Sequence, residues 1–358
     1  MIVFVFGILL AAIVCLLLFS WTQIRRIERL HPPSGEFVDV GGYRLHCLHV
    51  PAPETADLPA IVFLHGASGN LLDQVKAFRH RLDGRAEMLF VDRPGHGWSE
   101  RGPTHNGFPD GQARAIAALM ARKNMGKALI VGHSFGGIIA ANMALETPER
   151  VAGLLFLASA SHPWPGGIDW HYRLASNKVV GRIFAWLAVM PVGLSRIDWV
   201  ARCVFSPNAY PPDYVRETAA ALVLRPGAFC NNAVDVANLY PHVVAVSPRY
   251  GEIVKPTVVM TGDTDEIVSP DIHSACLAGA IGGSTLLRVK GVGHKPDYAA
   301  NDLCLSALEH LSGRPVDLDA LARQLEKQLQ QQAAGSDANR QFGAANPGQM
   351  PVIPSDPI

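Results

Sequence analysis

A serine lies among glycines in the stretch VGHSFGG, residues 131–137. The run ALIVG that leads into it is typical of a buried strand, and the run GGIIAANMALE that follows is typical of a helix. The pattern Gly132-x-Ser134-x-Gly136 at a strand-to-helix turn holds a serine in a strained conformation with its hydroxyl exposed. The start of the helix also favours developing negative charge. We therefore predict that Ser134 is a nucleophile rather than an ordinary turn residue.

A serine hydroxyl is a weak nucleophile at neutral pH and needs a base. Because the chain has 14 histidines, position decides, and His294 follows the last predicted strand in the loop VKGVGHKPDY. An acid that orients this base is expected after the preceding strand, in VVMTGDTDEIVSP. We favour Asp265 there, with Asp263 as the second choice and Asp235 as a remote third. The order Ser134, Asp265, His294 is the order expected for this architecture.

A tetrahedral intermediate at the serine would need two N–H donors. One is expected from Phe135, the residue that follows the nucleophile. The other is expected from the loop HGASGN after the strand AIVFL, and we nominate the amide of Ala67. Both donors are main-chain amides, so the identity of the side chains at positions 67 and 135 says little about whether the prediction is right.

The elements that must hold these residues alternate between strands and helices. Extended runs flank Gly41-Gly42 as a predicted hairpin, and apolar strands follow in PAIVFLHG, EMLFVDRPGHGWS, KALIVGHS, VAGLLFLAS, PTVVMTGDTD and STLLRVKGVGH. Helical stretches are expected around residues 71–82 and 112–122 and from about Asn301. This alternation predicts an α/β fold with a mostly parallel sheet covered on both faces.

The rhythm breaks between residues 162 and 245, which are mostly helical in pattern and carry four of the six tryptophans. We predict an inserted helical cap there. Residues 317–332 favour a polar helix, and the remainder, rich in Ala, Gly, Asn and Pro, is expected to be disordered. The predicted organisation is an anchor (1–22), a first part of the core (23–161), the cap (162–245), a second part of the core (246–313) and a polar tail (314–358).

The first 19 residues, MIVFVFGILLAAIVCLLLF, carry no polar side chain. An apolar run of this length is long enough to span a bilayer as a helix. A cleaved signal peptide is the alternative, but the apolar run has no basic residues before it and no A-x-A-like site after it. We predict a retained single-span membrane anchor. Arg25, Arg26 and Arg29 follow the span and favour a cytoplasmic catalytic domain, although the membrane side stays open.

Composition narrows the function classes. The chain has 358 residues, 31 basic and 31 acidic, and is 49% hydrophobic and 17% charged. This balance argues against a nucleic-acid-binding protein, which would show a basic excess. The six cysteines have no C-x-x-C spacing, so we predict neither a zinc site nor a disulfide framework.

Five motifs in order resemble the α/β-hydrolase superfamily from about Glu36 to Gly313: His65-Gly66, DRPGHGWS, GHSFGG, GDTDEIV and GVGH. The resemblance implies a doubly wound sheet of the eight-stranded type, with a lid after the sixth strand that suits residues 162–245. Similar haloalkane dehalogenases and epoxide hydrolases carry an aspartate where this chain has Ser134. The single HG followed by Ala67, in place of HGGG, favours the lid-bearing, esterase- or lipase-like group.

The resemblance and the candidate triad together predict a serine hydrolase that needs no cofactor and no metal. A small, lipophilic acyl substrate, most simply a carboxylic ester, is expected from the anchor and from an apolar pocket under the Trp- and Leu-rich cap. Carbon–carbon bond hydrolases, thioesterases and peptidases use the same triad and remain alternatives. A non-catalytic binding protein on this fold is a further alternative. Protein partners and oligomeric state are not predicted.

Overall fold

Short apolar runs form the eight strands of one sheet in the computed structural model, which describes residues 1–344. The strand order is β1-β2-β4-β3-β5-β6-β7-β8. The first two pairings, β1 with β2 and β2 with β4, are antiparallel, and all the others are parallel. The strands are β1 (Glu36–Asp39), β2 (Arg44–Val50), β3 (Ile61–Leu64), β4 (Met88–Val91), β5 (Ala128–His133), β6 (Val151–Leu157), β7 (Thr257–Gly262) and β8 (Thr285–Val289).

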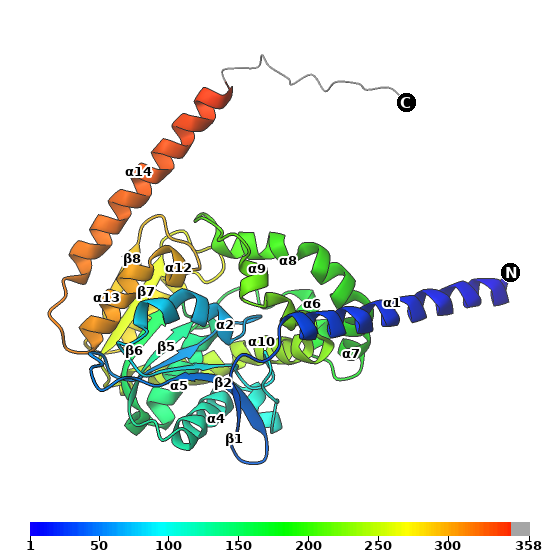
Figure 1. Ribbon diagram of the computed structural model, residues 1–358, viewed down its shortest axis with the longest axis horizontal. Coiled ribbons are helices and arrows are strands. Elements are labelled where there is room, and N and C mark those ends of the chain that lie inside the picture. The colour runs from blue at the N-terminus through cyan, green and yellow to red at the C-terminus, as the bar shows by residue number, and fades with distance from the viewer. Residues whose placement is uncertain (345–358) are drawn as a thin grey trace.

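Helices cover both faces of the sheet, as the unbroken apolar strands predict (Figure 1). The α-helices are α1 (Ile2–Leu30), α2 (Leu71–Gln74), α3 (His80–Leu82), α4 (Pro109–Arg122), α5 (Phe135–Glu146), α6 (Trp170–Ala175), α7 (Val180–Phe184), α8 (Met190–Phe205), α9 (Tyr214–Glu217), α10 (Pro226–Val246), α11 (Cys276–Ala280), α12 (Pro296–Ala299), α13 (Asn301–Leu311) and α14 (Leu318–Ala344).

Strand β3 shows how the two layers arise from period-two alternation. Val62 and Leu64 join one apolar cluster with α4, α5 and α10, whereas Ile61 and Phe63 join a second cluster with α2, α3 and α13. All four side chains are fully buried. Because both faces need a cover, the chain crosses from strand to strand through helices, and the carboxyl ends of the parallel strands meet at one edge.

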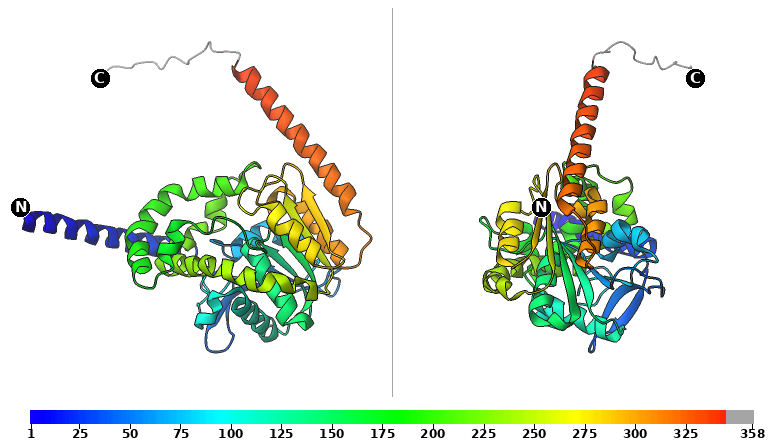
Figure 2. Two further views of the ribbon diagram at one scale, coloured as in Figure 1. Left: turned by 180° about the vertical axis from the view of Figure 1, so that it is seen from behind. Right: turned by 90° about the vertical axis from the view of Figure 1, so that its left-hand side faces the viewer.

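The segment between β6 and β7 contains α6 to α10 and no strand within the described part of the chain. These helices gather at one end of the sheet, beside the inner end of α1 (Figures 1 and 2). Two of the four tryptophans that suggested an apolar interior point outwards instead. Trp170 is 70% exposed and Trp199 is 61% exposed. The expectation that the tryptophan-rich composition marks a pocket lining is therefore wrong for these two residues, because composition does not say which face of a helix a side chain occupies.

The polar helix predicted for residues 317–332 extends further, as α14 (Leu318–Ala344). Its first turn is anchored by Leu318 and Ala322, which are buried against the sheet side that also packs α13. Residues 333–344 were expected to be disordered and are helical, since a sequence with few Gly or Pro until residue 343 continues a helix once it has started. Residues 345–358 of the predicted disordered tail lie outside the described residues.

Candidate active site

Ser134 lies in the sharp turn between β5 and α5. Its backbone has φ 52° and ψ −117°, a conformation that a residue with a side chain rarely adopts. A Cβ on Gly132 would come within 2.6 Å of the Gly136 carbonyl oxygen, and one on Gly136 would overlap the carbonyl of Leu64. The two glycines are therefore required by close packing, and the turn leaves the Ser134 side chain only half-buried. Strain of this kind is typical of functional residues.

His294 stands between the serine and a carboxylate. Its Nε2 lies 3.1 Å from Ser134 Oγ, and its Nδ1 lies 2.8 Å from Asp265 Oδ2. Asp265 follows β7, His294 follows β8, and both side chains are buried. The second oxygen of Asp265 accepts the amides of Ile267 and Val268, each at 2.9 Å. The structure thus brings together the three residues that chain order selected, with the carboxylate fixed from two sides.

The electrostatics of this group favour a charged acid. Burial alone would raise the pKa of Asp265, but the hydrogen bond and charge of His294 and the two backbone amides outweigh it and lower the pKa below its ordinary value. An ionised Asp265 that accepts Nδ1–H leaves Nε2 of a neutral ring free to accept a proton from the serine. The arrangement can therefore deprotonate a hydroxyl nucleophile.

The two other acids considered from the sequence lie elsewhere. Asp263 accepts the amide of Gly291 at 2.8 Å, so it ties the loop after β7 to the loop after β8. Asp235, on α10, is fully buried between Arg93 at 2.9 Å and Arg101 at 2.5 Å. The structure records no contact of either carboxylate with His294.

The loop that contains Ala67 borders the serine. A Cβ on Gly66 would lie 3.1 Å from the Cβ of Ser134, so the two turns touch. Phe135 is the first residue of α5, and an amide at that position has no carbonyl partner within its own helix. Arg93 contacts both segments, since it donates to the Gly66 carbonyl at 3.2 Å and stacks 4.5 Å above the Phe135 ring.

Comparison with known proteins agrees with this architecture. A family model described as alpha/beta hydrolase fold matches residues 59–179. The structure of 2-hydroxy-6-oxo-6-phenylhexa-2,4-dienoate hydrolase from Rhodococcus sp. strain RHA1 superposes with a TM-score of 0.63 at 20% identity, covering 78% of this chain and 99% of that one. This chain has the α/β-hydrolase fold.

Relatives by sequence include enzymes. The chain is 24% identical to 2-hydroxy-6-oxo-6-phenylhexa-2,4-dienoate hydrolase from Comamonas testosteroni over 70% of this chain and 86% of that protein. It is 32% identical to the dihydrolipoyllysine-residue acetyltransferase component of the acetoin cleaving system from Pseudomonas putida, over 37% of this chain and only 35% of that protein. Esterases and an enol-lactonase are among the other similar proteins. The relatives thus include hydrolases that act on different bonds.

The cap of this α/β-hydrolase fold forms hydrogen bonds with the Ala67 loop. Asn232 of α10 is fully buried, and its Oδ1 accepts the Ser68 amide at 2.7 Å while its Nδ2 donates to Ser68 Oγ at 3.0 Å. Asn70 donates from the loop to the Thr218 carbonyl at 2.8 Å. Ser68 has φ 58°, so these contacts support an unfavourable backbone conformation. The position of the Ala67 amide therefore depends on the cap.

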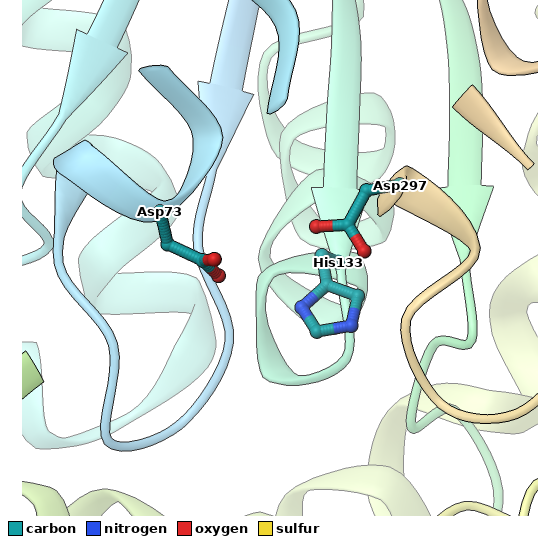
Figure 3. A group of neighbouring side chains, drawn as sticks. All are labelled: Asp73, His133 and Asp297. Atoms are coloured by element: carbon teal, nitrogen blue, oxygen red, sulfur yellow. The ribbon is translucent and has the colours of Figure 1, made fainter. Parts of the chain in front are cut away.

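A buried group of charged residues lies behind the base, and sequence reasoning missed it. Lys295, next to His294, donates to Asp73 at 2.8 Å and to Asp297 at 2.9 Å. His133 completes the group, with Nε2 2.9 Å from the His294 carbonyl oxygen. Figure 3 shows the two carboxylates on α2 and α12 facing the space above the His133 ring at the end of β5.

Asp73, His133 and Asp297 have donor atoms within 4.8 Å of one another, which is the spacing of a metal site. The Lys295 ammonium contacts both carboxylates and already supplies the positive charge that balances them, so the set does not fit a resident divalent ion. Burial would raise the pKa of Asp73, but Lys295 outweighs it and lowers the pKa to about 2. Burial lowers the pKa of His133 well below its ordinary value, and the neighbouring ammonium lowers it further.

The cap also reaches this group. Tyr214 of α9 donates its hydroxyl to Asp73 at 2.8 Å, and Tyr298 of α12 donates to the Asp73 backbone carbonyl at 2.9 Å. Asp73 therefore joins the cap, the helix after the Ala67 loop and the loop of His294. One signal in the sequence pointed here, namely an aspartate in the helical stretch LLDQVKAF directly after the Ala67 loop.

Proposed function

We propose that this protein is a membrane-anchored serine hydrolase that cleaves lipophilic carboxylic esters through Ser134, His294 and Asp265. The observation that carries the proposal is the position of His294, which bridges Ser134 Oγ and Asp265 Oδ2 at 3.1 and 2.8 Å. A structural turn serine would need neither a buried histidine at its hydroxyl nor a carboxylate behind that histidine. The hydrolase relatives support the same reaction class.

In the first half-reaction Ser134 Oγ attacks the acyl carbonyl carbon while its proton passes to His294 Nε2. Asp265 stabilises the imidazolium that forms. The carbonyl π electrons move to the oxygen, and the amides of Ala67 and Phe135 donate to that oxyanion. Collapse of the intermediate expels the alcohol, which takes the proton from His294 and leaves an acyl-serine.

In the second half-reaction water takes the place of the alcohol. His294 accepts a proton from the water, whose oxygen attacks the acyl carbon, and the collapsing intermediate releases the carboxylic acid and returns the proton to Ser134. Every proton that leaves is returned, so the cycle needs no cofactor and no metal.

The substrate class follows from location. Residues 2–19 of α1 are apolar and exposed, and the helix is long and apolar enough to cross a membrane. Arg25, Arg26 and Arg29 at its inner end favour a catalytic domain on the cytoplasmic side. An enzyme held at a bilayer meets lipophilic esters at high local concentration, which favours them over polar ones.

The test uses the full chain in detergent micelles and p-nitrophenyl esters from acetyl to palmitoyl. We expect turnover that rises with acyl length and is lost in Ser134→Ala, while Ser195→Ala, an exposed serine on α8, keeps full activity. A fluorophosphonate probe should label the wild type and Ser195→Ala but not Ser134→Ala. Absence of both turnover and labelling in a folded protein would refute the catalytic proposal.

A carbon–carbon bond hydrolase is the second candidate, favoured by the relative that the chain matches over 86% of its length. Such an enzyme uses the same serine, histidine and aspartate on an activated ketone. Serine-dependent turnover confined to acetyl and butyryl esters, with cleavage of a vinylogous 1,5-diketone, would support this candidate and contradict lipophilic ester specificity.

A further inference from the structure

Helix α1 consists of an exposed outer part and an inner part packed on the cap. Residues 2–19 are exposed along their whole length, whereas Ser20 and Ile27 are buried. Ile27 packs among Ala185, Val189 and Met190 of the cap. At about 1.5 Å per residue the exposed part is about 27 Å long. This length is close to the hydrocarbon thickness of a bilayer, about 30 Å.

The point where α1 leaves the cap therefore marks the membrane surface. Ser20 Oγ donates to the Trp186 carbonyl at 2.7 Å, so the turn of the cap around Trp186 lies at the same level. Trp21, the next residue, is 51% exposed, and tryptophan is enriched at this level of membrane proteins. The outer part of α1 projects beyond the cap helices (Figures 1 and 2).

The cap helices around Trp186 expose large apolar side chains. We call this set the cap face: Trp170 is 70% exposed, Val179 68%, Val180 47%, Ile183 57% and Val192 54%. The set spans α6, α7 and the first turn of α8, which are the elements on either side of Trp186. Exposed apolar patches of this kind mark protein or membrane contacts rather than ordinary surface.

Charge favours a lipid surface over a protein partner. The segment 170–205 carries five basic residues and one acidic residue, which are Arg173, Lys178, Arg182, Arg196, Arg202 and Asp198. Arg173, Lys178 and Arg182 are exposed and form no ion pair with the described side chains. Apolar side chains interleaved with unpaired basic ones are typical of helices that lie in the interface of an anionic membrane.

The segment 170–205 does not have the features of a second membrane span. The run Val180–Phe205 passes by length and composition, but Val189, Met190 and Phe205 are buried in the protein. Arg182, Arg196 and Asp198 would then be placed in hydrocarbon, at a cost of several kcal/mol. A surface orientation keeps these charges in water.

We propose that the cap face rests on the bilayer beside α1 and immerses its side chains at the level of the lipid headgroups. The proposal relies on the membrane anchor of the proposed function but not on its chemistry. Two separate contacts, α1 and the cap face, would then fix the orientation of the catalytic domain on the membrane.

The test measures tryptophan quenching by lipids. The full chain is reconstituted into phosphatidylcholine–phosphatidylglycerol vesicles with brominated or ordinary acyl chains. Because bromine quenches only nearby indoles, Trp170→Phe should remove quenchable emission. Trp164→Phe is the matched control, since Trp164 is partly buried and packs edge-on against Tyr240 at 5.2 Å, and it should remove unquenched emission only.

A second variant tests the contact itself. Val180→Asp combined with Ile183→Asp should abolish the quenching of Trp170, whereas Val254→Asp, at a more exposed valine outside the cap, should leave it unchanged. The emission lost in Trp21→Phe reports separately on α1. Quenched Trp21 with unquenched Trp170, or Trp170 quenching that survives the double substitution, would overturn the proposal. If Trp21 is also unquenched, the proposal that α1 is a membrane anchor is refuted. The proposed hydrolase activity is then still tested separately by the turnover of p-nitrophenyl esters.

Discussion

The buried lysine beside the base gives a prediction whose size follows from its surroundings. Lys295 is 1% exposed and contacts two carboxylates, Asp73 and Asp297, that are themselves buried. The change Lys295→Met removes the ammonium and keeps most of the volume. Breaking a buried ion pair by removing one partner typically costs about 3–5 kcal/mol, because the other charge is left uncompensated. With two carboxylates on one ammonium, we expect a loss at the upper end of this range at pH 7.

The pH dependence of this loss is the sharper test. In the wild type the pKa of Asp73 is lowered to about 2, so its stabilising contribution is present above the ordinary carboxyl range and is lost as the pH falls towards 2. Without the ammonium, burial should raise the pKa values of Asp73 and Asp297, and both take up protons in the folded state as the pH falls. His133, whose pKa the ammonium helps to lower, should also protonate more readily. The stability gap between variant and wild type should therefore narrow from pH 7 to pH 5.

Urea denaturation of the full chain in detergent, followed by circular dichroism at pH 7, 6 and 5, measures the gap. Lys290→Met is the matched control, because Lys290 is an exposed lysine at the end of β8, and it should lie within about 0.5 kcal/mol of wild type. If Lys295→Met does not fold, adding Asp297→Asn should restore folding by removing one of the orphaned charges. A gap below 1 kcal/mol at pH 7, or one that widens on acidification, would refute the reasoning.

Three further predictions address the acid, the Ala67 loop and pH. Asp265→Asn should lower kcat by about 10³- to 10⁴-fold, since the ring of the base loses its orienting charge, whereas Asp263→Asn should lower it far less, as ester turnover will show. Asn232→Ala should reduce kcat on p-nitrophenyl esters more than it changes KM, because it leaves the Ser68 amide unpaired at a cost of about 1–3 kcal/mol; an unchanged kcat would contradict the supporting role. Burial lowers the pKa of His65 to about 3, so below pH 6.5 this residue binds a proton in the unfolded chain but not in the folded one. The free energy of unfolding should therefore fall by about 1.4 kcal/mol, per such histidine, for each unit by which the pH is lowered below 6.5. Denaturation curves that show equal or greater stability at pH 5.5 than at pH 7.5 would exclude this.

The parts of the site that the sequence predicts are those coded by local pattern. Ser134 is recognisable because a strand, a turn and a helix follow one another within a few residues, and the same pattern fixes its backbone. His294 and Asp265 are recognisable because carboxyl ends of parallel strands share one edge of the sheet. The distances from His294 to Ser134 Oγ and Asp265 Oδ2, 3.1 and 2.8 Å, depend on the folded structure and do not follow from the sequence pattern.

The buried charges near His294, in contrast, could not be predicted from local sequence patterns. Asp73 and Lys295 are 222 positions apart, and no periodicity in either segment indicates the partner. Similarly, the cap tryptophans identify an apolar segment without telling which of them face inwards. Pairing between distant segments and the choice of face depend on tertiary packing, which no short stretch of the sequence encodes.

The contacts of the cap connect α1 to the candidate site. Ile27 is 5% exposed among the cap residues, and Arg225 of the cap pairs with Glu28 at 3.4 Å. From the same cap, Asn232 holds the Ser68 amide and Tyr214 holds Asp73. Burial of a side chain such as Ile27 contributes about 1.5–3 kcal/mol, so the inner end of α1 belongs to the packed structure of the cap. An anchor of this kind differs from a flexible tether, because displacing it would also loosen the helices that position the proposed oxyanion donors. Under the proposed membrane anchoring, the same group of helices sets both the orientation of the domain on the membrane and the geometry of its candidate site.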